Sequence, residues 1–292
     1  MTEGSRDSSL RLGLPKGRMQ AEVFALLDAA GLKVRAGARE YRPTISAGDF
    51  NVKILKPQNI VEMLAANSRD VGFAGADWVA ELGADVVELL DTGFDPVQLV
   101  AAAPEALLDD GRLSRRIDLV VASEYLRLTG RWIAGSGLAA RVVRSYGATE
   151  VFPPDDADII VDNTATGATL AANGLTIIDT LMRSSTRLYA NPRALDDPAR
   201  RGAIDDMTML LKSVLDARQR VMCEVNVSAD RLEAVCAVLP CMREPTVAVL
   251  HGGGGYAIKA AVLRSSLPKL VPLIKATGGS DIVITTLTQL VP

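Results

Sequence analysis

The chain has 292 residues, of which 48% are hydrophobic and 23% are charged, so it can hold two or three domains around a large core. The net charge is −3 and the basic residues are dispersed, which argues against bulk binding to nucleic acid. The three cysteines fall in the last third of the chain without the spacing of a zinc site, and this indicates free thiols in a reducing compartment.

Residues 1–9 are polar and lack the apolar segment of a signal peptide, so we expect a disordered tail there. No stretch approaches the roughly 20 unbroken apolar residues of a membrane helix. Together these features predict a cytoplasmic protein without a membrane partner.

The first predicted strand, at 10–14, leads into Pro15-Lys16-Gly17-Arg18 and then an amphipathic helix at 19–30. Lys16 and Arg18 flank a glycine where the helix starts, and such a loop suits phosphate oxygens. A solvated basic turn explains the same residues equally well.

Two more predicted strands, at 52–55 and 70–77, end at residues that could contact a ligand, Lys56 after the first and Gly75 and Asp77 in the second. Glycines near the end of the second strand allow a ligand to approach the backbone closely. Ligands of open α/β sheets lie beyond the carboxyl ends of strands. One cleft is therefore predicted to receive Lys16, Arg18, Lys56, Gly75 and Asp77.

The polar segment at 104–116 is a candidate crossover to a second lobe, and the strand at 119–122 is predicted to begin that lobe. Ser123 is the expected N-cap of a helix that runs to about residue 134. The other predicted elements of this region are helices at 60–66 and 205–220 and separate strands at 86–90, 97–103, 140–143, 175–181 and 187–190.

The most distinctive stretch runs from Asp158 to Leu170. A β-branched run at 159–161 predicts a short buried strand, which ends at Asp162 and enters a turn of small and hydroxylated residues before a helix. Backbone amides converge in such a turn and suit a phosphate, while Asp162 suits sugar hydroxyls or a metal ion. The local pattern alone favours an ordinary turn capped by Thr164 or Thr166.

From residue 221 the pattern changes to β-α-β-β-α-β, the order of a ferredoxin-like module. The glycine run at 252–255 is predicted to be a hairpin tip rather than a ligand loop. The predicted strands are 221–227, 246–250, 256–263 and 281–286, with helices at 230–239 and 267–276.

Short motifs along nearly the whole chain follow the order and spacing of a known family. They are Leu14-Pro15-Lys16-Gly17-Arg18, Pro57-Gln58, Asp70-Val71-Gly72 with Gly75-Ala76-Asp77, Ala122-Ser123-Glu124-Tyr125, Gly147-Ala148-Thr149-Glu150, Asp162 through Leu170 with Ala172-Asn173-Gly174-Leu175, Leu239-Pro240 and Pro245-Thr246. On these motifs the chain resembles the long, self-regulated form of ATP phosphoribosyltransferase, the first enzyme of histidine biosynthesis. Each motif alone is weak, and their combination is specific.

The resemblance implies an α/β fold. It has two lobes like a type II periplasmic binding protein and a C-terminal ferredoxin-like (ACT-like) regulatory domain. The implied divisions are a tail at 1–9, catalytic lobe I at 10–103 and 186–217, lobe II at 104–185 and a regulatory domain at 218–292.

The resemblance also implies a reaction that joins N1 of the adenine of ATP to the anomeric carbon of phosphoribosyl pyrophosphate, with release of pyrophosphate. Mg²⁺ is expected on the pyrophosphate, histidine as a feedback inhibitor, and a homo-oligomer between a dimer and a hexamer. The alternative is a non-catalytic small-molecule sensor or regulatory subunit on the same two-lobed fold.

Site residues follow from the same resemblance. Lys16, Arg18 and Asp162 are the implied catalytic residues. Lys16, Arg18 and Lys56 would face phosphates, Asp162 and Glu150 would face ribose hydroxyls or Mg²⁺, and Asp77 would line the nucleotide side. The implied phosphate cradle is Thr164, Ala165, Thr166, Gly167, Ala168 and Thr169, and the implied histidine pocket holds Asn226, Met242 and Thr246. Asn163 stands where the family usually has an aliphatic residue, and Lys56 where it usually has arginine.

Overall fold

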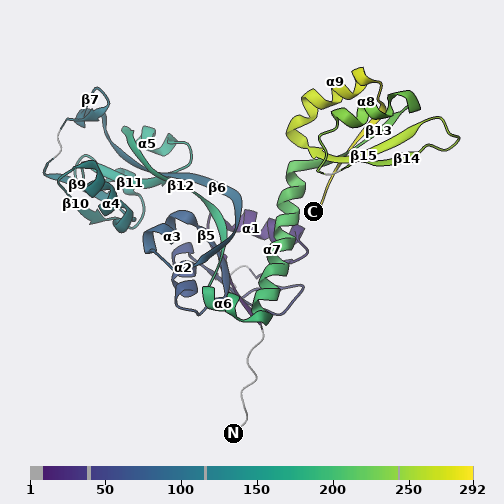
Figure 1. Ribbon diagram of the computed structural model, residues 1–292. Helices are drawn as coiled ribbons and strands as arrows, with labels where there is room; N and C mark the ends of the chain where they lie inside the picture. Colours follow the sequence, from purple (N-terminus) through teal and green to yellow (C-terminus); the bar gives the residue numbers. More distant parts are fainter. Residues whose placement is uncertain (1–8, 38–40, 115–116, 243, 292) are drawn as a thin grey trace, which may run out of the picture. The chain divides into compact units, whose positions relative to one another are not determined.

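The computed structural model describes residues 9–37, 41–114, 117–242 and 244–291 (Figure 1). The tail predicted at 1–9 lies outside the described residues except for Ser9, which is buried. The chain divides into two compact units, Met1–Ala25 with Lys33–Asp205 and Leu26–Leu32 with Asp206–Pro292.

The first unit is built on an eight-stranded sheet in the order β10-β9-β11-β6-β12-β5-β1-β4. Its outer strands pair in parallel, and β6 and β12 pair antiparallel with each other and with their outer neighbours. The strands are β1 (Leu10–Pro15), β4 (Phe50–Leu55), β5 (Val71–Gly75), β6 (Val87–Pro104), β9 (Leu119–Ser123), β10 (Ala140–Arg144), β11 (Ile159–Thr164) and β12 (Leu175–Ala190).

The strands β6 and β12 run side by side from one half of this sheet to the other (Figure 1). We call the half with β1, β4 and β5 lobe I, and the half with β9, β10 and β11 lobe II. The prediction of four separate strands in place of β6 and β12 is wrong, and the segment after β6 is not the crossover. Turn-forming residues such as Gly93 and Asp95 have positive φ inside β6, and register shifts accommodate them without ending the strand.

Helices cover both lobes. The strand predicted to run to Asp77 in fact ends at Gly75, and α3 begins at Ala76, so a helix there was missed. A Cβ at Gly75 would overlap Asp77 Oδ1, which explains the glycine at this junction. The helices of this unit are α1 (Gln20–Ala29), α2 (Pro57–Ala65), α3 (Ala76–Leu82), α4 (Leu126–Ser136), α5 (Ala168–Ala172), α6 (Pro192–Asp196) and α7 (Pro198–Gln219), of which α1 and α7 continue into the second unit.

The start of α4 differs from the prediction, because Ser123 does not cap it. The Ser123 hydroxyl instead accepts from Tyr125 N and donates to Val161 O. The first amides of α4 donate to the carboxylate of Glu81 on α3. Lobe I therefore supplies the N-terminal cap of a lobe II helix.

Asp70 directly precedes β5, and its side chain is fully buried. Arg11 Nη2 lies 2.5 Å and Arg200 Nη1 3.0 Å from Asp70 Oδ1, and Arg11 N donates to Oδ2 at 2.8 Å. This motif residue thus holds β1, β5 and α7 together in lobe I.

Short elements complete the chain. They are β2 (Val34–Arg35), β3 (Thr44–Ile45), β7 (Leu108–Asp109), β8 (Arg112–Leu113) and the 3-10 helices η1 (Glu105–Leu107), η2 (Thr149–Val151), η3 (Ala229–Arg231) and η4 (Arg264–Ser266).

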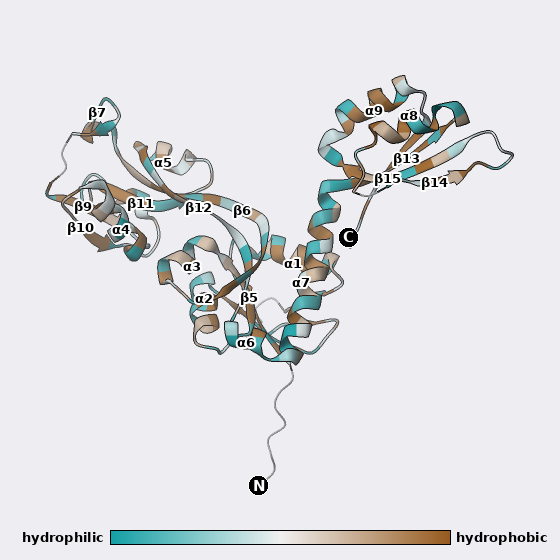
Figure 2. Cartoon of the chain, in the orientation of Figure 1, coloured by the Kyte–Doolittle hydropathy of each residue, from teal (hydrophilic) through white to brown (hydrophobic). Residues whose placement is uncertain are grey.

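The second unit confirms the β-α-β-β-α-β order in an antiparallel sheet arranged β14-β15-β13-β16. Alternate residues of β13 point into a core under α8 and α9, and Figure 2 shows apolar residues on these helices and strands. Residues 252–255 lie in the turn between β14 and β15, as predicted. The elements are β13 (Arg220–Val227), α8 (Leu232–Val238), β14 (Thr246–Val249), β15 (Tyr256–Leu263), α9 (Leu267–Thr277) and β16 (Ser280–Thr286). None of the helices in the described part of the chain has the length and apolar character that a membrane crossing needs.

Candidate functional site

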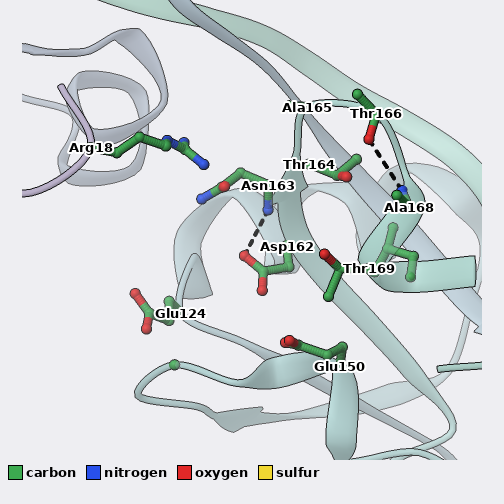
Figure 3. Close-up of a pocket in the computed structure, with 12 residues that line it drawn as sticks. Arg18, Glu124, Glu150, Asp162, Asn163, Thr164, Ala165, Thr166, Ala168 and Thr169 are labelled. Carbon is green, nitrogen blue, oxygen red and sulfur yellow. Dashed lines mark hydrogen bonds between the residues drawn. The ribbon is translucent and has the colours of Figure 1, made fainter. Parts of the chain in front are cut away.

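A pocket of about 400 Å³ lies at the carboxyl end of β11, between the two lobes of the first unit (Figure 3). Lobe II contributes most of its wall, and Arg18 reaches it from the loop after β1 in lobe I. The lining residues are Arg18, Glu124, Gly147, Glu150, Asp162, Asn163, Thr164, Ala165, Thr166, Ala168, Thr169 and Leu170. The structure thus brings together most of the residues predicted for one site.

The turn between β11 and α5 is held by its own threonines. Gly167 N donates to Thr164 Oγ1 at 2.9 Å, and Ala168 N donates to Thr166 Oγ1 at 3.4 Å. Gly167 has φ +77°, a conformation that glycine adopts without strain. The two threonine hydroxyls thus hold the turn, but neither caps α5, whose N-cap is Gly167 without a side-chain cap hydrogen bond. The turn also lines the pocket. Gly167 itself is not among the lining residues.

The opposite wall of the pocket is acidic. Asp162, Glu124 and Glu150 all line it, and Asp162 Oδ1 accepts from Asn163 N at 2.7 Å (Figure 3). Burial raises the pKa of Asp162 to about 6, and the charges of Glu124 and Glu150 act in the same direction against the hydrogen bonds from Asn163 and Thr149. Asp162 is therefore a carboxylate that changes its charge close to neutral pH.

Arg18 is the cation among the described residues that line this pocket. Its side chain is 57% exposed, and Nε lies 2.7 Å from Asp95 Oδ1 on β6. The end of the Arg18 side chain points toward the pocket, as Figure 3 shows. The site thus combines hydroxyl and amide donors, carboxylates and one guanidinium, a set suited to a phosphorylated sugar.

Comparison with known proteins assigns the chain to a family. The model of the ATP phosphoribosyltransferase family (HisG) matches residues 56–213, and that of the HisG C-terminal domain matches residues 217–289. The chain belongs to the ATP phosphoribosyltransferase family. It is accordingly an enzyme of the glycosyltransferase class.

Individual relatives of this family align over nearly their whole length, as the long form requires. The ATP phosphoribosyltransferase of Pelotomaculum thermopropionicum is 35% identical over 97% of this chain and 99% of its own. That of Desulforudis audaxviator is 36% identical over the same shares. Among solved structures, the ATP phosphoribosyl transferase (HisG:HisZ) complex from Thermotoga maritima covers 70% of this chain and 98% of its own, with a TM-score of 0.60 and 22% identity. That structural likeness shows the shared fold.

Two of the predicted cations lie outside the pocket just described. Lys16 Nζ donates to Tyr41 Oη at 3.0 Å and lies 4.9 Å from the centre of the same ring. Lys56 lines a second pocket of about 290 Å³ in the same unit. That pocket is lined by Lys56, Gln58, Glu62, Trp78, Glu81, Leu82, Glu124, Arg144, Ser145 and Tyr146. Because Glu124 lines both pockets, they are neighbours.

Asp77, predicted on the nucleotide side, lines neither pocket and is 3% exposed. Its carboxylate accepts from Tyr125 Oη at 2.6 Å and from Ser184 Oγ at 2.7 Å. Glu124, named from the sequence in a motif, and Asn163, named as a departure from the family, were given no site role, yet both line the first pocket. Glu124 directly follows the carboxyl end of β9, so the strand-end rule applied to the other residues identifies it too.

In the second unit, Met242 and Thr246 line a pocket of about 420 Å³. Its other lining residues are Met222, Cys241, Glu244, Lys259, Ala260, Ala261, Leu290 and Val291. Asn226 is not among them, and its Nδ2 donates to Asp281 Oδ2 at 3.2 Å. Two of the three residues predicted for a histidine pocket are thus brought together. The described residues hold no group of three or more His, Cys, Asp or Glu side chains that could bind a metal ion.

Proposed function

We propose that this chain joins N1 of the adenine of ATP to the anomeric carbon of phosphoribosyl pyrophosphate and releases pyrophosphate. The observation that carries the proposal is the first pocket, where the threonine-rich turn faces three carboxylates and Arg18. Family membership supplies the reaction, and this pocket is where its sugar substrate fits.

The turn from Thr164 to Thr169 holds the 5′-phosphate of the sugar. A phosphate oxygen carries charge and accepts hydrogen bonds more strongly than a hydroxyl does. It therefore takes over the amides of Gly167 and Ala168 from the threonine hydroxyls that now occupy them. Thr166 and Thr169 add their own hydroxyls, and Ala165 its backbone.

Asp162 and Glu150 accept hydrogen bonds from the ribose hydroxyls. Their carboxylate oxygens are also the hard donors that Mg²⁺ prefers when it is held mainly by substrate phosphates, so the pocket fits a Mg²⁺–pyrophosphate complex. When bound, the ion offsets negative charge on the leaving pyrophosphate.

Positive charge develops on the ribose as pyrophosphate leaves, so catalysis is mainly positioning and electrostatic stabilisation. Arg18 serves the leaving group, with Lys16 nearby in the same loop. The second pocket receives ATP: Lys56 faces its phosphates, and Trp78 and the 86% exposed Tyr146 offer aromatic faces to the adenine. Asp77 supports this side indirectly, because it holds Tyr125, whose ring stacks on Trp78 at 4.7 Å.

A spectrophotometric assay for phosphoribosyl-ATP, with both substrates and Mg²⁺ saturating, tests the function. Product formation at a rate of at least about 0.1 s⁻¹, below the usual enzyme range, is expected. A folded protein that binds phosphoribosyl pyrophosphate and forms no product would favour the alternative of a non-catalytic sensor on the same fold.

Regulation and assembly are the remaining parts of the proposal. Histidine binds the pocket of Met242 and Thr246, with Asn226 at the neighbouring strand, and inhibits the enzyme as a homo-oligomer between a dimer and a hexamer in the cytoplasm. Adding histidine to the assay, with Thr246→Leu as the desensitised variant, tests this. Equal inhibition of both proteins would place the inhibitor elsewhere.

Gly167→Val is expected to weaken binding of phosphoribosyl pyrophosphate about 100-fold in calorimetry. A Cβ at this position would meet Ile177 Cδ1 at an ordinary 3.6 Å, so the cost comes from φ +77°, which a β-branched residue rarely adopts. The turn must then rearrange. Gly202→Val, in α7 with nothing within 4 Å of its Cβ, is the matched control and should bind normally. Unchanged affinity of Gly167→Val would remove the turn from the site.

A further inference from the structure

A chain of hydrogen bonds, buried except at its Asn163 end, crosses from lobe I to the end of β11 in lobe II. Ser184 Oγ donates to Asp77 Oδ1 at 2.7 Å, Tyr125 Oη donates to Asp77 Oδ2 at 2.6 Å, and Asn163 Nδ2 donates to Tyr125 Oη at 2.8 Å. Asp77 and Ser184 belong to α3 and β12, whereas Tyr125 and Asn163 belong to lobe II. Tyr125 is fully buried.

The chemistry of the chain sets the direction of each bond. Burial, followed by the charge of Asp77, raises the pKa of Tyr125, so the hydroxyl stays protonated and donates its hydrogen bond to the carboxylate. The Tyr125 oxygen is then available only as an acceptor. The amide NH₂ of Asn163 meets that requirement, and an aliphatic side chain at position 163 does not.

Tyr125 itself is held firmly from lobe I. Its ring stacks on Trp78 of α3, with centroids 4.7 Å apart and planes 28° apart. Glu81, one turn further along α3, accepts from the amides of Arg127 and Leu128 at 2.9 Å each, directly after Tyr125 in the chain. Helix α3 therefore fixes the start of α4, and the Asn163–Tyr125 bond extends this fixed position to β11.

Asn163 is adjacent to Asp162, and both line the sugar pocket. Asn163 N also donates to Asp162 Oδ1. The last residues of β11 and the phosphate turn that follows are thus placed relative to lobe I. The opposing cation of the pocket, Arg18, comes from lobe I as well.

We propose that Asn163 and Tyr125 are positioning residues for phosphoribosyl transfer: their hydrogen bond holds Asp162 and the phosphate turn of lobe II at a set distance from Arg18 of lobe I. This inference rests on the proposed function. Displacing reacting groups by about 1 Å can lower a rate about 100-fold without removing any contacting residue. A purely structural role would lower stability and leave the rate of folded enzyme unchanged.

The test compares Asn163→Leu, Tyr125→Phe and the double variant with wild type. Leucine matches the shape of asparagine, and phenylalanine keeps the stack on Trp78 while it removes one oxygen. Tyr189→Phe is the control, because Tyr189 is a buried tyrosine of β12 that lines neither pocket. Each protein is measured for kcat, for the Kd of phosphoribosyl pyrophosphate by calorimetry, and for Tm.

Each single variant should lose about 10- to 100-fold in kcat, while Kd stays within about threefold. Because both changes break the same bond, the double variant should be no more than about threefold slower than the slower single variant. Tyr189→Phe should match wild type. The proposal is overturned if either single variant keeps kcat within threefold of wild type, if the two losses multiply, or if phosphoribosyl pyrophosphate binding is lost. An inactive wild-type protein would instead refute the proposed function.

Discussion

Asp162→Asn is expected to lower kcat/KM about 100- to 1000-fold at pH 8 and, at the same pH, to raise the stability of the ligand-free protein. The activity falls because an amide cannot replace a carboxylate toward ribose hydroxyls and Mg²⁺. The stability rises because the folded protein holds the Asp162 carboxylate in a buried place beside Glu124 and Glu150.

The sign follows from the pKa of Asp162, raised from 3.8 to about 6 in the folded protein. The folded state binds this proton more tightly than the unfolded state, so the carboxyl costs almost nothing near pH 4, and its cost grows as the pH rises toward about 6 and then levels off. At pH 8 the cost is at most about 3 kcal/mol. Asp162→Asn removes this cost, so the gain in unfolding free energy should be nearly absent at pH 4, grow between about pH 4 and 6, and stay constant above about pH 7.

Chemical denaturation at pH 4 and pH 8, together with a pH–rate profile, checks both effects. Wild-type kcat/KM should rise with pH through about 6 as Asp162 ionises. The variant should lack that rise. Asp156→Asn, an exposed carboxylate of the same lobe, should change neither activity nor stability. A variant with full activity, or with lower stability at pH 8 than wild type, would contradict the role given to Asp162.

The fold was predictable where local pattern and tertiary pairing agree. Alternating strands and helices indicated the α/β unit, and the order of elements after residue 221 indicated the ferredoxin-like module. The prediction of two separate strands in place of β6 was wrong. Gly93 and Asp95 are turn-forming residues with positive φ, but the extended pairing of β6 with β12 continues past them. The prediction also missed α3, because the sequence Gly75-Ala76-Asp77 is typical of a strand end. The contacts that place Asp77 inside the fold come from Tyr125 and Ser184, which are far along the chain.

The site shows the same division. The turn after Asp162 and the Arg18 loop were predicted from local pattern, strand-end geometry and family resemblance. Asn163 was noticed only as a departure from the family. Its hydrogen bond joins it to Tyr125, 38 residues away, and no local pattern reports such a pair. Asp77 was predicted to contact the nucleotide because it follows a strand end. In the structure both of its carboxylate oxygens accept hydrogen bonds from other residues of the fold.

Arg18→Ala is expected to lower kcat about 100- to 1000-fold, with a smaller loss in affinity for phosphoribosyl pyrophosphate. The guanidinium faces the pocket from lobe I, where negative charge grows on the leaving pyrophosphate, so its contribution is larger in the transition state than in the ground state. Arg18→Lys keeps the charge and loses the planar fork, and it should recover only part of the rate. Steady-state kinetics and calorimetry on the same samples separate the two effects. Arg141→Ala, on β10 and outside both pockets, is the control.

Asp95→Asn tests the same arginine in the opposite direction. Arg18 now shares its guanidinium with Asp95 at 2.7 Å, and an anionic substrate must compete for it. The pair is largely solvated on the arginine side, so its strength is at most about 1 kcal/mol. Asp95→Asn should therefore tighten binding of phosphoribosyl pyrophosphate by no more than about fivefold, and the gain should shrink at high salt. If Arg18→Ala were fully active, or if Asp95→Asn weakened binding, Arg18 would not be the cation that stabilises the negative charge of the leaving pyrophosphate. The cation would then have to come from Lys16 or Lys56.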